Sequence, residues 1–303
     1  MKVLVTGATG FVGREVLQHL HGHTIRILGR KVMTASLAGF RRRFETEAHP
    51  GDIADAASIE GCCDGVEAVI HLVGIIREIG ANSFQRVHEQ GTRHLLAEAR
   101  RAGVKRFIHM SALGTRPDAR SRYHQSKWAA EEAVRQSGLD FTIFRPSVIY
   151  GAQDEFVNQF VRLATLCPVL PVVGSGQHRL QPVPVEIVGS CFGRALSEPA
   201  SIGRTLDVCG PDALTLNDLL DAVMAAVGRR RLKFHIPLPL ARLAAGGMEL
   251  LLARCLHLPP PLTRDQILML QEDNVGDPKP VCELFRFQPI SFREGLSIHL
   301  TQQ

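Results

Sequence analysis

The sequence lacks several features that would place it outside ordinary globular proteins. It has no uninterrupted apolar run of roughly 18 residues, so we expect no membrane-spanning helix. Its seven cysteines include no C-x-x-C pair, which argues for reduced thiols in the cytosol and against a zinc or other metal site. The chain begins directly in an apolar strand, so we also expect no signal peptide.

The sequence also has little excess charge and no basic tail. Its 35 basic and 30 acidic side chains give a net charge of +5, which disfavours nucleic acid as a partner but suits an anionic cofactor or membrane surface. At 303 residues, with 45% hydrophobic and 21% charged residues, the chain can bury a large core and form two lobes.

The first stretch of the chain carries the strongest motif. An apolar strand at 3–5 is followed by Gly7, Gly10 and Gly13, and then by apolar residues at helical spacing over 16–20. In a dinucleotide-binding turn, the first glycine permits the tight turn, the second admits a pyrophosphate, and the third lets helix and strand pack closely. The helix N-terminus then offers free N–H groups to the phosphates. The predicted cofactor residues of this loop are Gly7, Thr9, Gly10, Phe11, Val12 and Gly13.

The second strand, predicted over 24–28, ends at Arg30 and Lys31. Dinucleotide sites that select NAD usually carry a carboxylate here, whereas a cation suits the 2′-phosphate of NADP. We therefore favour NADP(H) and leave NAD(H) open. The alternative is that Arg30 is an ordinary solvated cation.

Two further strand ends supply candidate cofactor residues. Asp52 and Ile53 follow the third strand, where Asp52 either accepts from the adenine amino group or caps a turn. The apolar strand 66–73 ends at Val73 and Gly74, and Gly74 would let the cofactor ribose lie close. His71, within that strand, is interpreted as a core histidine.

The alternation continues with a helix over 83–101 and a strand over 104–110. Strands that alternate with helices of ordinary length predict an α/β fold with a Rossmann-type, doubly wound parallel sheet. Because such crossovers are right-handed, the carboxyl ends of all strands meet at one edge of the sheet, where ligands bind.

Ser111 follows the fifth strand, and Tyr123 and Lys127 lie on one face of a helix predicted over 120–137. We expect Tyr123 to act as acid and base, with a pKa lowered by the Lys127 ammonium. Lys127 would also bind the nicotinamide ribose. Ser111 would polarise a substrate carbonyl.

These residues resemble the short-chain dehydrogenase/reductase superfamily, in its extended and atypical branches. The loop TGATGFVG at 6–13 matches the cofactor turn, and Ser111, Tyr123 and Lys127 match the catalytic trio. The segment RPSVIYG at 145–151 matches the stretch that lies along the nicotinamide, which implies cofactor contacts from Pro146, Ser147 and Val148. One departure is His88, where extended members commonly carry an asparagine.

The second half of the chain resembles one subgroup, the bacterial relatives of the nucleotide-binding accessory subunit of respiratory complex I. The similar segments are 151–163, 168–176, 179–183 and 262–275. The resemblance implies NADPH binding and a possible respiratory-chain partner. A helix predicted over 184–196 and a strand over 205–209 return the chain to the sheet. We therefore expect a Rossmann domain over 1–150, completed by about 184–210, and a smaller, discontinuous substrate or partner lobe over 151–183 and 211–303.

Three features of the second half allow more than one interpretation. Asp154 is expected to cap the following helix, with a substrate contact as the alternative. Arg179 either binds a substrate anion or forms a surface ion pair. The leucine-rich segment 236–262, bounded by prolines, is either a helix that closes the lobe or an interfacial helix on a membrane or partner.

Three functions remain open. The first is an NADP(H)-dependent oxidoreductase acting on a carbonyl or alcohol. The second is a non-catalytic, NADPH-binding accessory or assembly protein of the respiratory chain or quinone pathway. The third is a nucleotide-sugar epimerase or dehydratase, disfavoured by Arg30 and by the lack of a clear diphosphate clamp. We expect a cytoplasmic protein that also binds the inner membrane peripherally; the substrate and oligomeric state stay undefined.

Overall fold

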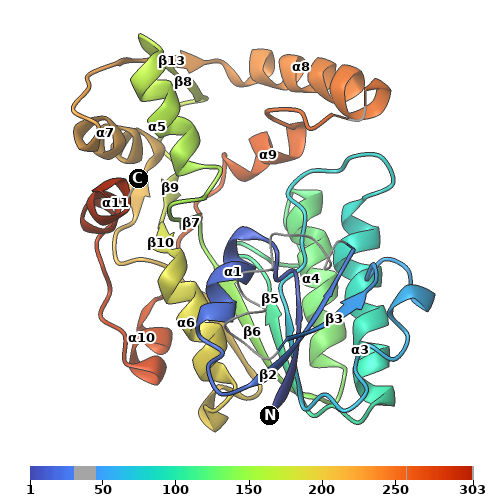
Figure 1. Ribbon diagram of the computed structural model, residues 1–303. Coiled ribbons are helices and arrows are strands. Elements are labelled where there is room, and N and C mark those ends of the chain that lie inside the picture. Colours follow the sequence, from blue (N-terminus) through green and yellow to red (C-terminus); the bar gives the residue numbers. More distant parts are fainter. Residues whose placement is uncertain (31–45, 257, 302–303) are drawn as a thin grey trace.

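The computed structural model describes residues 1–30, 46–256 and 258–301. Its centre is a parallel sheet of seven strands in the order β11-β6-β5-β4-β1-β2-β3. The strands are β1 (Lys2–Thr6), β2 (Thr24–Gly29), β3 (Thr46–Pro50), β4 (Ala68–His71), β5 (Arg106–Met110), β6 (Asp140–Pro146) and β11 (Arg204–Val208). The predicted Rossmann-type sheet is confirmed, and all seven carboxyl ends lie at one edge (Figure 1).

Helices cover both faces of the sheet because successive side chains of each strand point to opposite sides. Val3 and Val5 pack toward α1 (Phe11–Gln18), α6 (Val185–Ala195) and α10 (Lys279–Phe285). Leu4 packs on the other side, toward α3 (Gly91–Arg101) and α4 (Arg122–Arg135). The two buried clusters make the sheet a rigid platform for whatever its edge binds.

The rest of the chain forms a lobe above that edge, with its own apolar core (Figure 1). Its helices are α5 (Val157–Leu166), α7 (Leu216–Ala226), α8 (Leu238–Met248), α9 (Arg264–Met269) and α11 (Phe292–Thr301). Three strand pairs complete it: β7 (Ile149–Tyr150) with β10 (Val183–Pro184), β9 (Arg179–Leu180) with β12 (Leu214–Thr215), and β8 (Val169–Val173) with β13 (Leu232–Ile236). The exact division into domains stays a prediction, and α10 packs in the sheet's core.

Two predicted helices differ from the structure in their winding. The helix expected over 83–101 begins as a π-helix, η3 (Gln85–Gln90), before α3. The leucine-rich segment 236–262, expected to be helical, contains α8 followed by a second π-helix, η5 (Glu249–Cys255). A π-helix inserts an extra residue per turn and rotates the side chains that follow, which an apolar pattern does not reveal. Two short 3₁₀ turns, η2 (Ala57–Ile59) and η4 (Pro199–Ser201), lie in connections.

Candidate functional site

The glycine turn after β1 has the geometry that its spacing predicts. Gly7 has a φ of +75°, and a Cβ there would lie 3.1 Å from the backbone nitrogen of Val73. A Cβ on Gly13 would lie 2.1 Å from the Gly7 carbonyl oxygen, so no side chain fits between helix and strand. The turn closes with a 3.0 Å hydrogen bond from the Gly10 N–H to that carbonyl.

The N-terminus of α1 is available to an anion. Gly10 precedes the helix without a side-chain cap, and the first N–H groups of any helix have no acceptor within it. Thr9 and Gly10 are exposed beside it. Arg14 donates to the Thr9 carbonyl at 3.2 Å and to Gln153 at 3.1 Å, which adds a cation that sequence reasoning missed. These residues fit the pyrophosphate of a dinucleotide.

Phe11 and Val12, in the first turn of α1, are partly buried. The Phe11 ring lies against Gly151, where a Cβ would approach it to 3.1 Å. Phe11 therefore closes the cofactor turn against the start of the lobe segment.

The end of β2 places Arg30 beside Asp52. The Arg30 guanidinium lies 3.9 Å from one carboxylate oxygen of Asp52, and the other oxygen accepts the Ala54 N–H at 3.0 Å. Asp52 thus closes an Asx turn and partly balances the charge of Arg30. The Ile53 side chain is buried, and its carbonyl hydrogen-bonds His94 at 2.9 Å. Lys31 lies outside the described residues.

His88 connects the end of β4 to α4. Its Nε2 accepts the Ile75 N–H at 2.9 Å, so the ring proton is on Nδ1, which donates to the Ser126 hydroxyl at 2.8 Å. Ser126 donates in turn to the Tyr123 carbonyl at 2.7 Å. Burial lowers the pKa of His88 to about 2, assisted by the nearby Lys127 charge. His88 is therefore neutral, and both of its ring nitrogens are hydrogen-bonded.

Gly74 is exposed and lies next to both His88 and Lys127 of α4. A Cβ on Gly74 would lie 3.5 Å from His88 Nε2 and 3.8 Å from Lys127 Nζ. Val73, beside it, packs on the sheet core. His71 bonds Thr6 at 2.7 Å and Thr92 at 3.1 Å through its two ring nitrogens, which confirms it as a core histidine.

Ser111 and Lys127 meet at the end of β5. Lys127 Nζ donates to the Met110 carbonyl at 2.6 Å, and Met110 directly precedes Ser111. The Ser111 hydroxyl is buried and donates to Thr115 at 3.4 Å. Burial lowers the pKa of Lys127 to about 8, against the opposing influence of Glu131. Lys127 therefore sits as a partly desolvated cation at this edge of the sheet.

Tyr123 lies in an aromatic pocket made by Phe84, His88 and His124. Its ring meets theirs edge-to-face at centroid distances of 5.8, 5.5 and 5.1 Å. The expected lowering of the Tyr123 pKa is wrong for this structure, because burial raises that pKa to about 12. Lys127 is turned to the Met110 carbonyl instead. The phenol is therefore held protonated, in the state of a proton donor.

Helix α4, which carries Tyr123 and Lys127, is held at two points along its length. Asp265, on α9 of the lobe, accepts the backbone N–H groups of Arg122 at 2.7 Å and Tyr123 at 3.1 Å. Farther along α4, Glu131 is fully buried and forms a bidentate ion pair with Arg145, at 2.8 and 2.7 Å. The sequence pattern does not single out Asp265, although this residue lies in the segment 262–275 that resembles the complex I subgroup.

The segment after β6 is held by Asn274. The Ser147 hydroxyl donates to the Asn274 side chain at 2.6 Å, and that side chain donates to the Leu113 carbonyl at 2.9 Å. Pro146 is buried at the end of β6, and its carbonyl accepts the Leu113 N–H at 2.8 Å. Val148 packs against the core of the lobe. Asn274 thus ties the predicted nicotinamide segment to the loop after Ser111.

Two other residues singled out in the sequence form structural contacts, one a helix cap and the other an ion pair. Asp154 accepts the Val157 N–H at 2.5 Å and the Asn158 N–H at 3.3 Å, which confirms the cap on α5. The Arg179 guanidinium donates from Nε and Nη2 to one carboxylate oxygen of Asp273, at 3.0 and 2.8 Å, as the ion-pair alternative predicted.

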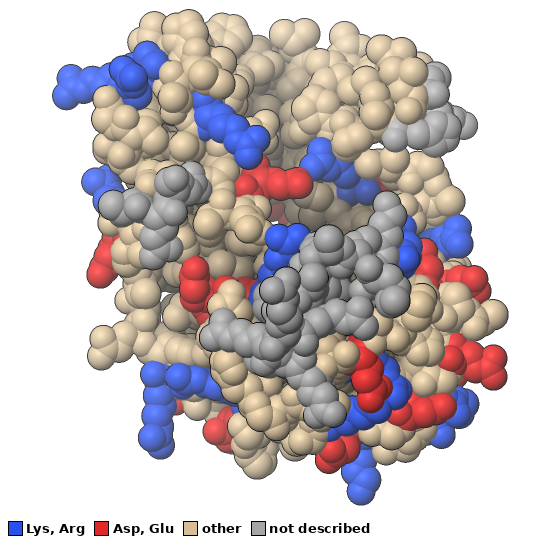
Figure 2. All heavy atoms as spheres, in the orientation of Figure 1, with Lys and Arg blue, Asp and Glu red and all other residues tan. Residues whose placement is uncertain are grey.

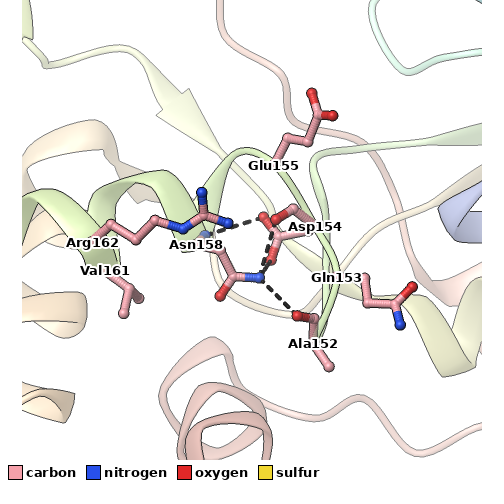
Figure 3. Close-up of a pocket in the computed structure, with 7 residues that line it drawn as sticks. All are labelled: Ala152, Gln153, Asp154, Glu155, Asn158, Val161 and Arg162. Atoms are coloured by element: carbon pink, nitrogen blue, oxygen red, sulfur yellow. Dashed lines mark hydrogen bonds between the residues drawn. The ribbon is translucent and has the colours of Figure 1, made fainter. Parts of the chain in front are cut away.

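A hollow of about 460 Å³ opens beside the Asp154 cap, where α5 begins (Figure 3). Gln153, the partner of Arg14, lines it. On a larger scale, the molecule is hollowed between the lobe and the sheet (Figure 2).

Comparison with known proteins agrees with this geometry. Residues 3–208 match the model of the NAD dependent epimerase/dehydratase family. The chain belongs to that family. The match includes the glycine turn and the Ser111, Tyr123 and Lys127 positions, and the resemblance to extended short-chain dehydrogenases/reductases is confirmed. Proteins of this family bind NAD(P).

Two curated relatives are informative. A mitochondrial NADH dehydrogenase [ubiquinone] 1 alpha subcomplex subunit 9 from Arabidopsis thaliana is 28% identical over 285 residues, spanning 89% of this chain and 68% of the relative. A ceramide reductase from Caulobacter vibrioides is 38% identical over 173 residues, spanning 56% of this chain and only 53% of the relative. The predicted likeness to the complex I subunit is thereby confirmed.

Among solved structures, the dTDP-glucose 4,6-dehydratase DesIV from Streptomyces venezuelae superposes with a TM-score of 0.75. It is 21% identical and covers 99% of this chain and 96% of its own. At that identity the likeness concerns the fold alone. Within the described residues of this chain, no helix has the length and apolar character to cross a membrane.

Proposed function

We propose that the protein is an NADP(H)-dependent oxidoreductase that acts on a carbonyl or alcohol. The observation that carries the proposal is the arrangement around Gly74. Gly74 is exposed, and a Cβ there would lie within contact distance of the His88 and Lys127 side chains. Lys127 lies one turn of α4 from Tyr123. A nicotinamide ring bound along Ser147 would supply or accept the hydride.

The chain's own residues supply the proton and the binding groups. In the reducing direction the Tyr123 hydroxyl donates its proton to the carbonyl oxygen as that oxygen gains negative charge. Ser111 donates a hydrogen bond to the same oxygen and stabilises the charge. With the cofactor bound, Lys127 would donate to the ribose hydroxyls in place of the Met110 carbonyl, and its ammonium would favour the ionised phenol. That movement would lower the Tyr123 pKa from its raised value.

The preference for NADP(H) rests on Arg30. Its guanidinium is exposed at the end of β2, and Asp52 at 3.9 Å holds it only loosely. A 2′-phosphate offers two charges and several acceptors, so it competes well for this guanidinium. NAD(H) lacks that phosphate and would leave Arg30 with Asp52.

We propose an amphiphilic lipid as the substrate class. The support is the relative named a ceramide reductase, whose name indicates that it reduces a lipid. The apolar surface of the lobe, described below, agrees with an encounter between the protein and lipid.

A second candidate is a non-catalytic accessory protein of the respiratory chain. The relative from a mitochondrial NADH dehydrogenase favours it, as does the resting site, where Lys127 is engaged elsewhere and the Tyr123 pKa is raised. In that role NADPH would stabilise the fold by binding only the native state. The epimerase or dehydratase alternative rests on the family name, but Arg179, a candidate diphosphate ligand, is paired with Asp273. In either leading role we place the protein in the cytoplasm, with peripheral attachment to the inner membrane.

The test is to release and identify the nucleotide that the purified protein carries, and then to follow NADPH oxidation with long-chain ketones, aldehydes and quinones. Bound NADP(H) together with turnover supports the oxidoreductase. Retained NADPH that no carbonyl compound or quinone oxidises supports the accessory role. Bound NAD(H) with no NADP(H) contradicts the cofactor assignment.

A further inference from the structure

The exposed apolar side chains of the lobe are concentrated on one surface. Among the described residues, ten of the fifteen exposed large hydrophobic side chains come from 166–169 and 232–258. Such a concentration marks an interaction site, whereas single exposed leucines are ordinary. We call this surface the apolar crest, and its members are Leu166, Val169, Leu232, Phe234, Leu240, Leu243, Leu250, Leu251, Leu256 and Leu258.

The first part of the apolar crest is the outer face of the β8–β13 ribbon. The strands pair in parallel with Leu232 opposite Val169 and Phe234 opposite Pro171. The alternate residues Leu170 and Val172 are buried in the lobe core, so the outer row cannot belong to that core. Leu232 is 77% exposed, which leaves a flat apolar strip facing away from the protein.

The second part is the α8–η5 arm, which follows β13 directly through Pro237. Ala241 and Ala245 are buried against Ile267 of α9 and fix the inner side of α8. Leu240 and Leu243 lie on the exposed side, with Leu243 75% exposed. Figure 1 shows β8, β13 and α8 together along the top of the molecule. The alternative in which these leucines close the lobe core is therefore wrong for the exposed leucines of α8.

Charge indicates the kind of partner. Arg229 and Arg230 are exposed immediately before β13, and Arg242 is exposed on α8. The acidic side chains nearest in sequence are neutralised: Asp221 by Lys233 at 2.8 Å and Glu249 by Arg264 at 2.8 Å. In Figure 2 the upper margin of the molecule shows no acidic side chains, and basic ones lie at its left end.

We propose that the apolar crest docks on an anionic lipid bilayer. Apolar side chains enter the acyl boundary while Arg229 and Arg230 meet the headgroups, which is the arrangement of interfacial proteins. A symmetric contact with a second copy fits less well, because it would bring the same arginines together while the nearest described carboxylates, Asp221 and Glu249, are already paired.

The apolar crest is closely connected to the candidate site. Ala245 of α8 packs on Ile267 of α9, and two residues before Ile267 lies Asp265, which binds the Tyr123 backbone. Arg77, in the loop after β4, donates to the Pro260 carbonyl just beyond the arm at 2.8 Å. Docking would therefore bring the site to the membrane surface. The docking itself does not depend on hydride transfer, so it can fail or hold independently of the proposed function.

The experiment is flotation of the full chain with vesicles of phosphatidylcholine alone or with 30% phosphatidylglycerol, at low and high salt. We expect binding to the anionic vesicles, weakened by salt but retained in part. The double variants Leu240→Ser/Leu243→Ser and Leu232→Ser/Phe234→Ser should each lower the partition coefficient by roughly tenfold or more. Arg229→Ala/Arg230→Ala should remove most of the salt dependence.

Ile202→Ser is the matched control, because Ile202 is an exposed apolar residue outside the apolar crest and should bind like wild type. Circular dichroism and thermal unfolding of each variant verify its fold without relying on cofactor binding. The proposal is overturned if wild type stays in solution with anionic vesicles, or if the leucine variants bind unchanged. It is also overturned if wild type is a dimer that these variants convert to monomers, since the apolar crest would then be an interface between copies.

Discussion

The carboxylate of Asp265 accepts the backbone N–H of Tyr123 at 3.1 Å, which joins the lobe to α4. The same carboxylate accepts the Arg122 N–H at 2.7 Å, so it satisfies two of the free donors at the start of α4. A negative charge at this position also interacts favourably with the helix dipole. The position of Tyr123 therefore depends on α9, which lies more than a hundred residues away in the sequence.

We expect Asp265→Ala to loosen the first turn of α4. Loss of a capping acceptor typically costs about 0.5–2 kcal/mol of stability, and the freed helix start should also lower kcat more than it raises KM. Asp265→Asn keeps an acceptor oxygen and should recover most of both losses. Denaturant unfolding and NADPH oxidation measure the two effects. Equal damage from Asn and Ala would show that the charge, and not the hydrogen bonds, holds the helix.

We expect Arg30→Ala to reduce the affinity for NADPH roughly 10- to 100-fold and the affinity for NADH very little, because a charge-assisted contact to the 2′-phosphate is lost. Asp52→Asn should have the opposite sign and strengthen NADPH binding modestly, since Asp52 competes for Arg30. Titration calorimetry with both nucleotides measures this, with Arg229→Ala as a remote arginine control. Equal losses for both nucleotides would contradict the preference.

We expect Lys127→Met to stabilise the cofactor-free protein while it weakens NADPH binding. Burial lowers the Lys127 pKa from 10.5 to about 8, so near neutral pH the folded state holds a costly charge. Removing that charge should add about 1–3 kcal/mol to the free energy of unfolding.

The lowered Lys127 pKa also determines how the stability difference between wild type and Lys127→Met changes with pH. Between pH 8 and 10.5 the folded state binds fewer protons than the unfolded state at this lysine, so wild-type stability gains from rising pH. Lys127→Met lacks that gain. When the free energy of unfolding is plotted against pH, the curves of wild type and variant should therefore converge toward pH 10.5. Parallel curves across this range would show that Lys127 keeps an ordinary pKa.

Local patterns predicted the sheet, the glycine turn and the cap at Asp154, because each of these depends on residues close together in the chain. The three glycines specify a turn whose sterics admit no side chain at Gly13, whatever the rest of the fold does. The strands of the sheet are likewise predicted by their runs of apolar residues.

The remaining features depend on tertiary contacts that spacing does not encode. The Tyr123 pKa was expected to fall because Lys127 is one helical turn away, but Lys127 bonds the Met110 carbonyl and burial raises that pKa instead. Asp265 and Asn274 reach the site from loops and helices of the lobe. The π-helices η3 and η5 likewise depend on packing against the rest of the fold, and an apolar pattern does not predict them.

The central claim, that this site transfers a hydride with Tyr123 as proton donor, is tested most directly by isotope transfer. The protein is incubated with NADPH deuterated at the transferable C4 position and with a lipid extract, and products are analysed by mass spectrometry. We predict a deuterium-labelled alcohol with wild type. We predict a labelling rate at least 100-fold lower with Tyr123→Phe, which keeps the ring and nearly full NADPH binding. No labelled product from wild type that binds NADPH, or equal labelling by the two proteins, would contradict the account.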